Sequence, residues 1–192
     1  MNNLLLNKFN LVSISFLLAL SAGANAFAEM VKYDQFIASN FTNSTNVDNN
    51  RMPLKPGMQF IYDGYTVDND EKVKHKVIII VTDLIKKING VDTVVIWDRD
   101  FSNGYLEESE LTFFAQDDDG NVWHLGQHSE IYEEDTLVGG AAWLVGHLEG
   151  AKAGIMMLST PKVDGKIISQ GFAPPPFNWT DGFKFIQSKN NL

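Results

Sequence analysis

The stretch that decides the fold is residues 72–97, KVKHKVIIIVTDLIKKINGVDTVVIW. Its first part alternates, with Val73, His75 and Val77 on one face and lysines on the other, which is the period of a β-strand. From Val77 to Val81 both faces are apolar, so this strand begins half-exposed and ends buried on both sides. Asn89-Gly90 is a typical tight-hairpin dipeptide, and the β-branched run 91–97 predicts the partner strand.

The same rhythm of short apolar runs and turn residues extends in both directions. It predicts five strands, at about 58–62, 72–81, 91–97, 105–115 and 121–126, separated by turns rich in Asn, Asp and Gly. The connections are too short for the crossovers that parallel strands require. The sequence therefore predicts a mainly β protein, an antiparallel meander sheet that curls into a half-barrel or open barrel.

Residues 136–158, TLVGGAAWLVGHLEGAKAGIMML, are apolar and rich in glycine. Small residues recur every four positions, as in packed membrane helices, but His147, Glu149 and Lys152 would be costly in lipid. The alternative is a buried glycine-rich loop or a pair of short strands that covers one end of the sheet. The sequence alone does not decide between loop, strand and helix.

The first 28 residues have the pattern of a secretory signal peptide. A short polar start with Lys8 precedes the apolar run 11–20, and the segment ends Ala26-Phe27-Ala28. The apolar run is shorter than the roughly 20 residues needed to span a bilayer as a helix. We expect cleavage after Ala28, and we expect the mature protein to be periplasmic or secreted and not a transmembrane protein.

The rest of the chain divides into two parts by composition. Residues 29–52 include an Asn-, Ser- and Thr-rich run and predict a flexible lead-in, and residues 53–192 predict a single β domain. The chain has 192 residues, no cysteine and a net charge of −9. Disulfides, thiolate metal sites and cysteine nucleophiles are therefore excluded, and a strongly acidic chain is a poor partner for nucleic acid or for an anionic membrane.

Several blocks carry a resemblance to a known group of proteins. They are Pro53-Leu54-Lys55-Pro56-Gly57, Phe60-Ile61-Tyr62-Asp63-Gly64, Val81-Thr82-Asp83, Asn89-Gly90-Val91, Asp98-Arg99-Asp100 and Ala115-Gln116-Asp117-Asp118-Asp119-Gly120-Asn121-Val122-Trp123. From about residue 53 to about residue 179 the chain resembles a family of uncharacterised secreted bacterial proteins. The resemblance implies no activity, and it implies a sheet similar to the curved half-barrels of periplasmic lipoprotein carriers. It also implies further strands after the proline stretch, so we expect a chain truncated at its C-terminus, with an open sheet edge.

Two sets of residues are candidates for binding. Trp97, Trp123, Trp143 and Phe113 could line an apolar pocket or stack on a ligand, although tryptophan in a β domain is more often core. The oxygen ligands Asp117, Asp119 and Asn121 surround Gly120 and could hold calcium. The full EF-hand spacing is absent, so a hairpin turn is the alternative interpretation.

Other constellations point less clearly to chemistry. His124 and His128 lie four apart on a predicted strand, roughly 13 Å along it, which is too far to share one metal unless the strand breaks at Gly126. Glu108 and Glu110 belong to a set of carboxylates from which a glycosidase could draw a catalytic pair. No nucleophile elbow, zinc-protease motif or phosphate-binding glycine loop occurs.

These observations lead to three hypotheses for function. The first is an exported, non-enzymatic β-protein that binds a small apolar or amphipathic ligand and needs no cofactor. The second is a structural envelope protein that binds a protein partner, for example through an open sheet edge. The third is a hydrolase of cell-wall glycans.

Overall fold

The computed structural model describes residues 30–31, 36–68 and 70–186, and the signal peptide predicted for residues 1–28 lies outside these ranges. Strands dominate the described chain and one short 3-10 turn, η2, precedes the main sheet. The elements are β1 (Met30–Val31), η2 (Ala38–Asn40), β2 (Gln59–Asp68), β3 (Glu71–Ile88), β4 (Val91–Ser102), β5 (Tyr105–Gln116), β6 (Val122–Glu133), β7 (Thr136–Leu144), β8 (Lys152–Met157), β9 (Ile167–Ala173) and β10 (Trp179–Phe183).

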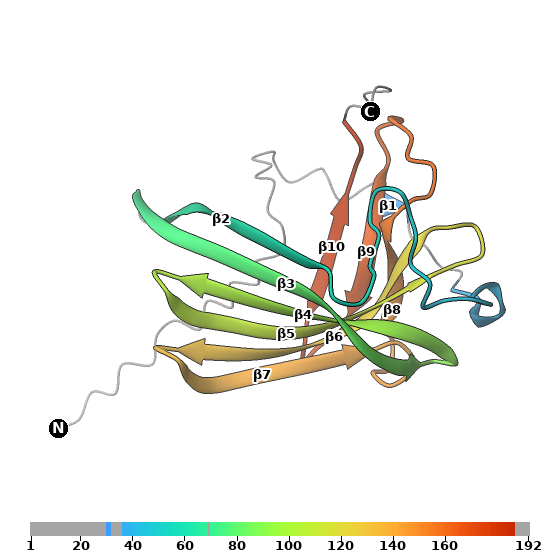
Figure 1. Ribbon diagram of the computed structural model, residues 1–192. Helices are drawn as coiled ribbons and strands as arrows, with labels where there is room; N and C mark the ends of the chain where they lie inside the picture. Colours follow the sequence, from blue (N-terminus) through green and yellow to red (C-terminus); the bar gives the residue numbers. More distant parts are fainter. Residues whose placement is uncertain (1–29, 32–35, 69, 187–192) are drawn as a thin grey trace.

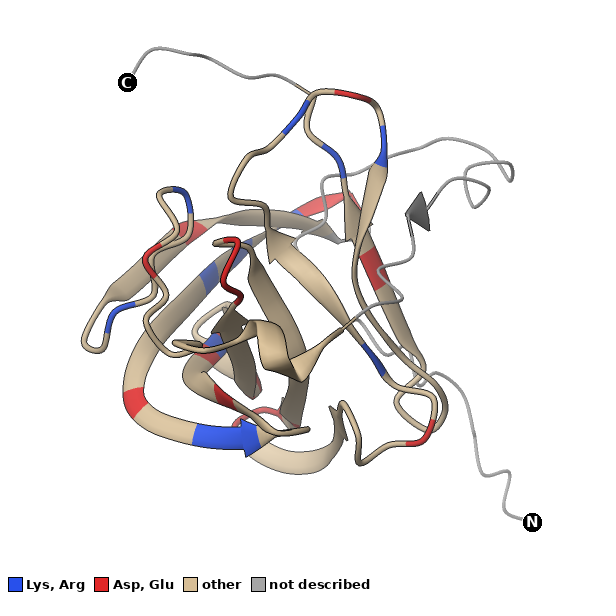
Figure 2. Ribbon diagram, turned by 90° about the vertical axis from the view of Figure 1, so that its right-hand side faces the viewer, with Lys and Arg blue, Asp and Glu red and all other residues tan. Residues whose placement is uncertain are grey.

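The strands form one sheet in the order β1-β9-β8-β6-β5-β4-β3-β2, with β7 also paired to β6 and β10 to β9. The pairings are antiparallel except for the short β1–β9 contact. Strands β2 to β7 form a broad curved sheet, and β8 to β10 stand at one end of it (Figure 1). Seen from that end, the sheet curls but does not close (Figure 2). The predicted antiparallel half-barrel is confirmed.

The hairpins form where the turn residues predict them. Asn89 and Gly90 connect β3 to β4 with φ values of 46° and 87°, and Asn103 and Gly104 connect β4 to β5 with 51° and 93°. Positive φ at both central residues is the backbone of the turn that matches the twist of antiparallel strands. Asn and Gly adopt that conformation at low cost, and so these dipeptides fix the register of the long hairpins.

The hydrophobic core occupies one end of the sheet and has two parts. One cluster joins β4, β5 and β6 to β7, β8 and β9, and Trp143 and Leu125 are among its fully buried members. The second cluster lies under residues 47–54 and includes Val81, Val94, Ile96 and Phe114. The end of the sheet near the β2–β3 and β4–β5 turns extends beyond both clusters (Figure 1).

The Asn-rich segment is part of this core in place of the flexible lead-in predicted from its composition. Val47 and Leu54 pair through an isolated bridge and are only 2% and 4% exposed. The Asn49 side chain donates to Gly120 O at 2.8 Å, and its Oδ1 accepts from the backbone N of Arg51. The correction has a physical reason. Asn and Ser side chains satisfy backbone groups in an irregular segment, which allows its few apolar residues to pack.

The glycine-rich segment forms strands β7 and β8 with a turn between them, which confirms the strand interpretation of residues 136–158. Gly154 explains part of its composition. A Cβ atom there would lie 2.1 Å from the backbone of Gln170 and Gly171, so only glycine allows β8 and β9 to approach this closely. No helix in the described residues is long and apolar enough to cross a membrane.

Candidate functional site

Four carboxyl groups meet on one face of the sheet, next to the core. Asp98 and Asp100 alternate on β4, and Glu108 and Glu110 alternate on β5. The register pairs Asp98 with Glu110 and Asp100 with Glu108. Because directly paired residues point to the same side of a sheet, all four side chains share one face, which we call the acidic face.

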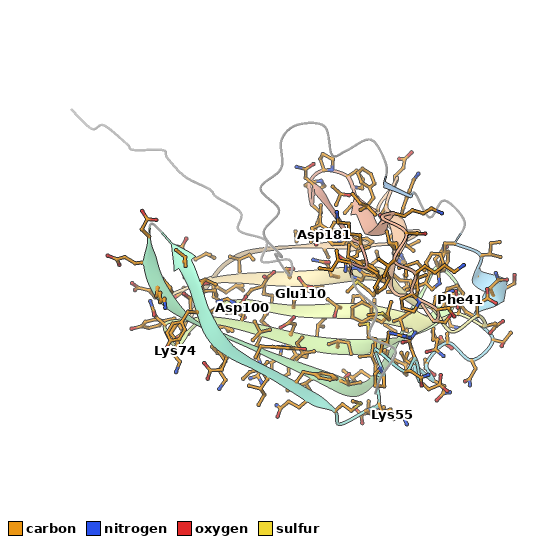
Figure 3. All side chains as sticks on the ribbon, turned by 90° about the horizontal axis from the view of Figure 1, so that it is seen from above. Phe41, Lys55, Lys74, Asp100, Glu110 and Asp181 are labelled. Carbon is orange, nitrogen blue, oxygen red and sulfur yellow. The ribbon has the colours of Figure 1, made fainter. Side chains whose placement is uncertain are left out.

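The acidic face continues the face that is apolar within the core. On β4, Val94 and Ile96 are each 2% exposed, and the next two residues on the same face are Asp98 and Asp100. The change from apolar to acidic side chains therefore occurs at the edge of the core cluster that lies under residues 47–54. Figure 3 shows Asp100 and Glu110 over the middle of the sheet, between Lys74 near one end and Phe41 near the other.

Polar neighbours hold the carboxyl groups in place. Ser129 Oγ on β6 donates to Glu110 Oε2 at 2.5 Å, and Gln127 Nε2 donates to the same oxygen at 3.0 Å. On the other side of the cluster, His75 Nε2 on β3 lies 3.1 Å from Asp100 Oδ1. The cluster thus extends across four strands, β3 to β6, and Asp98 Oδ1 has no hydrogen-bond partner in the described part of the chain.

Burial and mutual repulsion make these groups retain protons. Burial raises the pKa of Glu110 to about 8, and the negative charge of Glu108 adds to this effect while the Ser129 hydrogen bond opposes it. Burial also raises the pKa of Asp98 to about 7, with the charges of Asp100 and Glu108 as further causes. Carboxyl groups this close cannot all ionise.

The other two carboxyl groups follow the same direction. Burial raises the pKa of Asp100 to about 6, although the neighbouring His75 lowers it. Burial raises the pKa of Glu108 as well, against the hydrogen bonds from Ser129 and Glu110. Near neutral pH the cluster therefore presents both carboxylate acceptors and protonated carboxyl donors. Such perturbed groups are concentrated at binding and catalytic sites.

The aromatic residues predicted to bind a ligand do not form one site. Trp143 is 1% exposed and stacks on Trp179 at 5.5 Å between ring centroids, and Trp123 and Phe113 are 7% and 4% exposed in the same core cluster. Trp97 lies apart on β4, 36% exposed, with its ring under the Arg99 guanidinium at 4.1 Å. Three of the four residues are core, and they do not line the acidic face.

The predicted calcium ligands hold a turn together. Asp117 accepts hydrogen bonds from Asn121 N at 2.7 Å, Asn121 Nδ2 at 2.9 Å and Trp123 Nε1 at 2.7 Å. Asn121 Oδ1 in turn accepts from Ser159 N at 3.0 Å, and Asp119 makes none of these contacts. In the described residues no group of three or more His, Asp or Glu side chains is placed to hold a metal ion.

A bulge separates the two histidines that a regular strand would place on one face. His124 pairs with Phe114 and Gly126 pairs with Phe113, so Leu125 is an extra residue in β6. His124 is buried against the rings of Phe114 and Trp143, and His128 pairs with Leu111 on the opposite face. Burial lowers the pKa of His124 to about 4, which keeps this core imidazole neutral.

The sequence shows the two carboxyl pairs of the acidic face but not the register that brings them together. Asp98 and Asp100 lie before the turn at 102–104, and Glu108 and Glu110 lie after it, each pair with the period of two of a strand. A regular hairpin about Asn103-Gly104 would place Glu108 and Glu110 on the opposite face from the aspartates, and the bulge between Asp100 and Phe101 shifts the register by one residue and brings the two pairs together. Glu108 and Glu110 were candidates from sequence, but only the register adds Asp98, Asp100 and His75.

Comparisons of the chain with protein families, with curated proteins and with solved structures find no match.

Proposed function

We propose that this chain is an exported, non-enzymatic β-protein that binds a small amphipathic ligand on the acidic face. The ligand's head group would be cationic or rich in hydrogen-bond donors and would contact the carboxyl cluster. Its apolar part would lie along the neighbouring apolar positions of β3, such as Val77 and Ile79. The proposed export of the protein is inferred from the signal peptide pattern of residues 1–28. N-terminal sequencing of the protein from the periplasmic fraction tests it.

The observation that carries this proposal is the gathering of four carboxyl groups on one face, beside the hydrophobic core. Burying like charges together is unfavourable and contributes nothing to folding. A cationic head group offsets that cost, because it replaces the protons that the cluster otherwise retains. An apolar ligand without such a head would leave the cluster unused.

The experiment measures binding of a long-chain primary alkylamine and of the corresponding alcohol by calorimetry. We expect the amine to bind and to displace protons from the carboxyl cluster. The binding enthalpy measured at pH 7 should therefore differ between buffers of different ionisation enthalpy. Glu110→Gln should weaken amine binding about ten-fold or more, since one charge is lost at short range. Glu133→Gln, an exposed position on the same chain, is the matched control. Equal binding of amine and alcohol would contradict the proposal.

A second candidate is acid–base chemistry on a cell-wall glycan. It is favoured by two carboxyl groups in one cluster whose pKa values differ, about 6 for Asp100 and about 8 for Glu110, since such a pair can supply a base and an acid. Release of reducing sugars from purified cell wall tests it. Activity that is absent in the wild type, or unchanged by Glu110→Gln, excludes a role for this pair.

A partner-binding envelope protein is the remaining alternative. It rests on the open edge strand β2, where Ile61, Tyr65 and Val67 are 55%, 70% and 71% exposed. An unpaired strand edge with apolar side chains is a surface on which another strand can be added. Crosslinking from a cysteine introduced at Tyr65 in the native host would identify such a partner, with a cysteine at exposed Glu133 as the control.

A further inference from the structure

The face opposite the carboxyl cluster carries positive charge at the far end of the sheet. Lys72, Lys74 and Lys76 alternate on β3 with Val73 and His75, so they point away from the acidic face. Between β3 and the β4–β5 turn lies a hollow of about 390 Å³, within the size range of small-molecule sites. Its lining consists of Lys74, Lys76, Ile78, Phe101, Asn103 and Gly104.

The backbone fixes the walls of this hollow. Lys76 pairs directly with Phe101 across β3 and β4, which places the two side chains next to each other on one face of the sheet. The turn is tied to β3 at two points, because Asn103 N donates to Lys74 O at 2.8 Å and Lys74 N donates to Asn103 Oδ1 at 3.3 Å. The backbone of the turn therefore keeps a constant position against β3.

The two lysines of the hollow are available for an anion. Neither Lys74 nor Lys76 forms an ion pair with any residue for which the structure gives a position, although Asp63 pairs with Lys76 across β2 and β3. The neighbouring cations have aromatic contacts: Lys72 Nζ lies 5.9 Å from the Tyr65 ring centroid, and Arg99 lies over Trp97. In a chain with a net charge of −9, the three lysines of this strand, with Asp63 opposite Lys76, are a local excess of positive charge.

We propose that this hollow binds an oxyanionic amphipath, a molecule with a phosphate or carboxylate head and an apolar group. The ammonium groups of Lys74 and Lys76 bind the oxyanion, since charge-assisted hydrogen bonds are the strong ones. Ile78 and Phe101 contact the adjoining apolar group. The source of this chemistry is either a free molecule or a lipid head group in a membrane, and the site is independent of the acidic face.

The test measures binding of octyl phosphate, below its micellar concentration, by calorimetry. The wild type should bind octyl phosphate and not octanol. The double variant Lys74→Gln/Lys76→Gln should bind at least about ten-fold more weakly. Lys162→Gln/Lys184→Gln removes the same total charge at exposed positions elsewhere and should bind as the wild type does. Equal weakening in both double variants, or no weakening in the first, would overturn the site.

Two further experiments distinguish a free ligand from a membrane lipid and test the apolar contact made by Phe101. Sedimentation with phosphatidylglycerol vesicles that depends on Lys74 and Lys76 supports the site with a membrane lipid as its source. Binding of octyl phosphate without vesicle binding supports the site with a free ligand. Phe101→Ala should weaken octyl phosphate and leave inorganic phosphate unchanged, and equal effects on both would refute contact with the apolar group. Circular dichroism of each variant checks that it folds.

Discussion

At residue scale, Asp117 shows how one carboxylate organises a turn. It accepts hydrogen bonds from Asn121 and from the indole of Trp123, a residue in the core cluster. Asp117 is 9% exposed, whereas Asp119 of the same acidic run is exposed to solvent. The two aspartates therefore have different roles although they are two positions apart, and oxygen-rich composition alone does not distinguish them.

We expect Asp117→Ala to lower the free energy of unfolding by about 2–3 kcal/mol, because it leaves a buried indole N–H without its acceptor. Asp119→Ala should change it by less than about 0.5 kcal/mol. Urea unfolding followed by tryptophan fluorescence measures both. Addition of calcium or a chelator is a control for the metal interpretation. Stabilisation of the wild type by calcium that Asp117→Ala abolishes would show that the turn binds the ion.

At the scale of single elements, β8 depends on one glycine. Gly154 lies where β8 approaches the backbone of β9, and a Cβ atom there would have no room. We expect Gly154→Ala to cost more than about 3 kcal/mol through strain and loss of β8–β9 pairing. Gly139 on β7 has nothing within 4 Å of such an atom, so Gly139→Ala is the matched control. Thermal unfolding compares them, and similar melting temperatures would refute the close approach.

The segment before β2 contributes a second element-scale prediction. Leu54 is 4% exposed in the cluster with Val81 and Ile96, although it stands between Pro53 and Lys55 in a segment without regular strands. Leu54→Ala should destabilise the protein by about 2–4 kcal/mol, because it leaves a cavity under the segment. Limited proteolysis near residues 41–52 should become faster in this variant. Unchanged stability and protection would mean that the segment does not pack on the sheet in solution.

Sequence predicted the elements better than their irregularities. Asn89-Gly90 and Asn103-Gly104 encode hairpins locally, and alternation along 72–81 encodes a strand with two faces, so both were predictable. The extra residue Leu125 was not, because a bulge depends on pairing with β5 and β7. The acidic face is an intermediate case. Its residues alternate visibly, but their gathering needs the register of three hairpins.

At the scale of the whole molecule, the four clustered carboxyl groups and the three lysines of β3 lie on opposite faces of one sheet. Asp98, Asp100, Glu108 and Glu110 lie on one face, and Lys72, Lys74 and Lys76 lie on the other. Successive side chains of a strand point in opposite directions, and the register between β3 and β4 places the lysine positions and the aspartate positions on different faces. The net charge of −9, which is a sum over the whole chain, does not reveal this local separation of charge. The two proposed sites therefore favour ligands of opposite sign and should be occupied independently.

The carboxyl cluster also determines how the stability of the whole molecule depends on pH. The native pKa values of Glu110, Asp98 and Asp100 are about 8, 7 and 6, above the reference values of 4.5, 3.8 and 3.8. At pH values between the reference pKa and the native pKa of each group, the native state holds a proton that the unfolded chain releases. The free energy of unfolding therefore falls as pH rises, by about 1.4 kcal/mol per pH unit for each such proton. His124, with a pKa of about 4 against 6.5, acts in the opposite direction below pH 6.5.

Since several carboxyl groups oppose one histidine, the protein should be more stable at pH 5 than at pH 8. Urea unfolding across this range should show a free energy of unfolding that decreases steadily with rising pH. Glu110→Gln keeps an acceptor for Ser129 and Gln127 without a titrating group, so it should reduce the decrease by the contribution of one proton. Glu133→Gln should leave the profile unchanged because this side chain is exposed. A wild-type profile that is flat or rises between pH 5 and 8 would show that the cluster is ionised and solvated in the native state, and the cationic head-group proposal would then lose its physical basis.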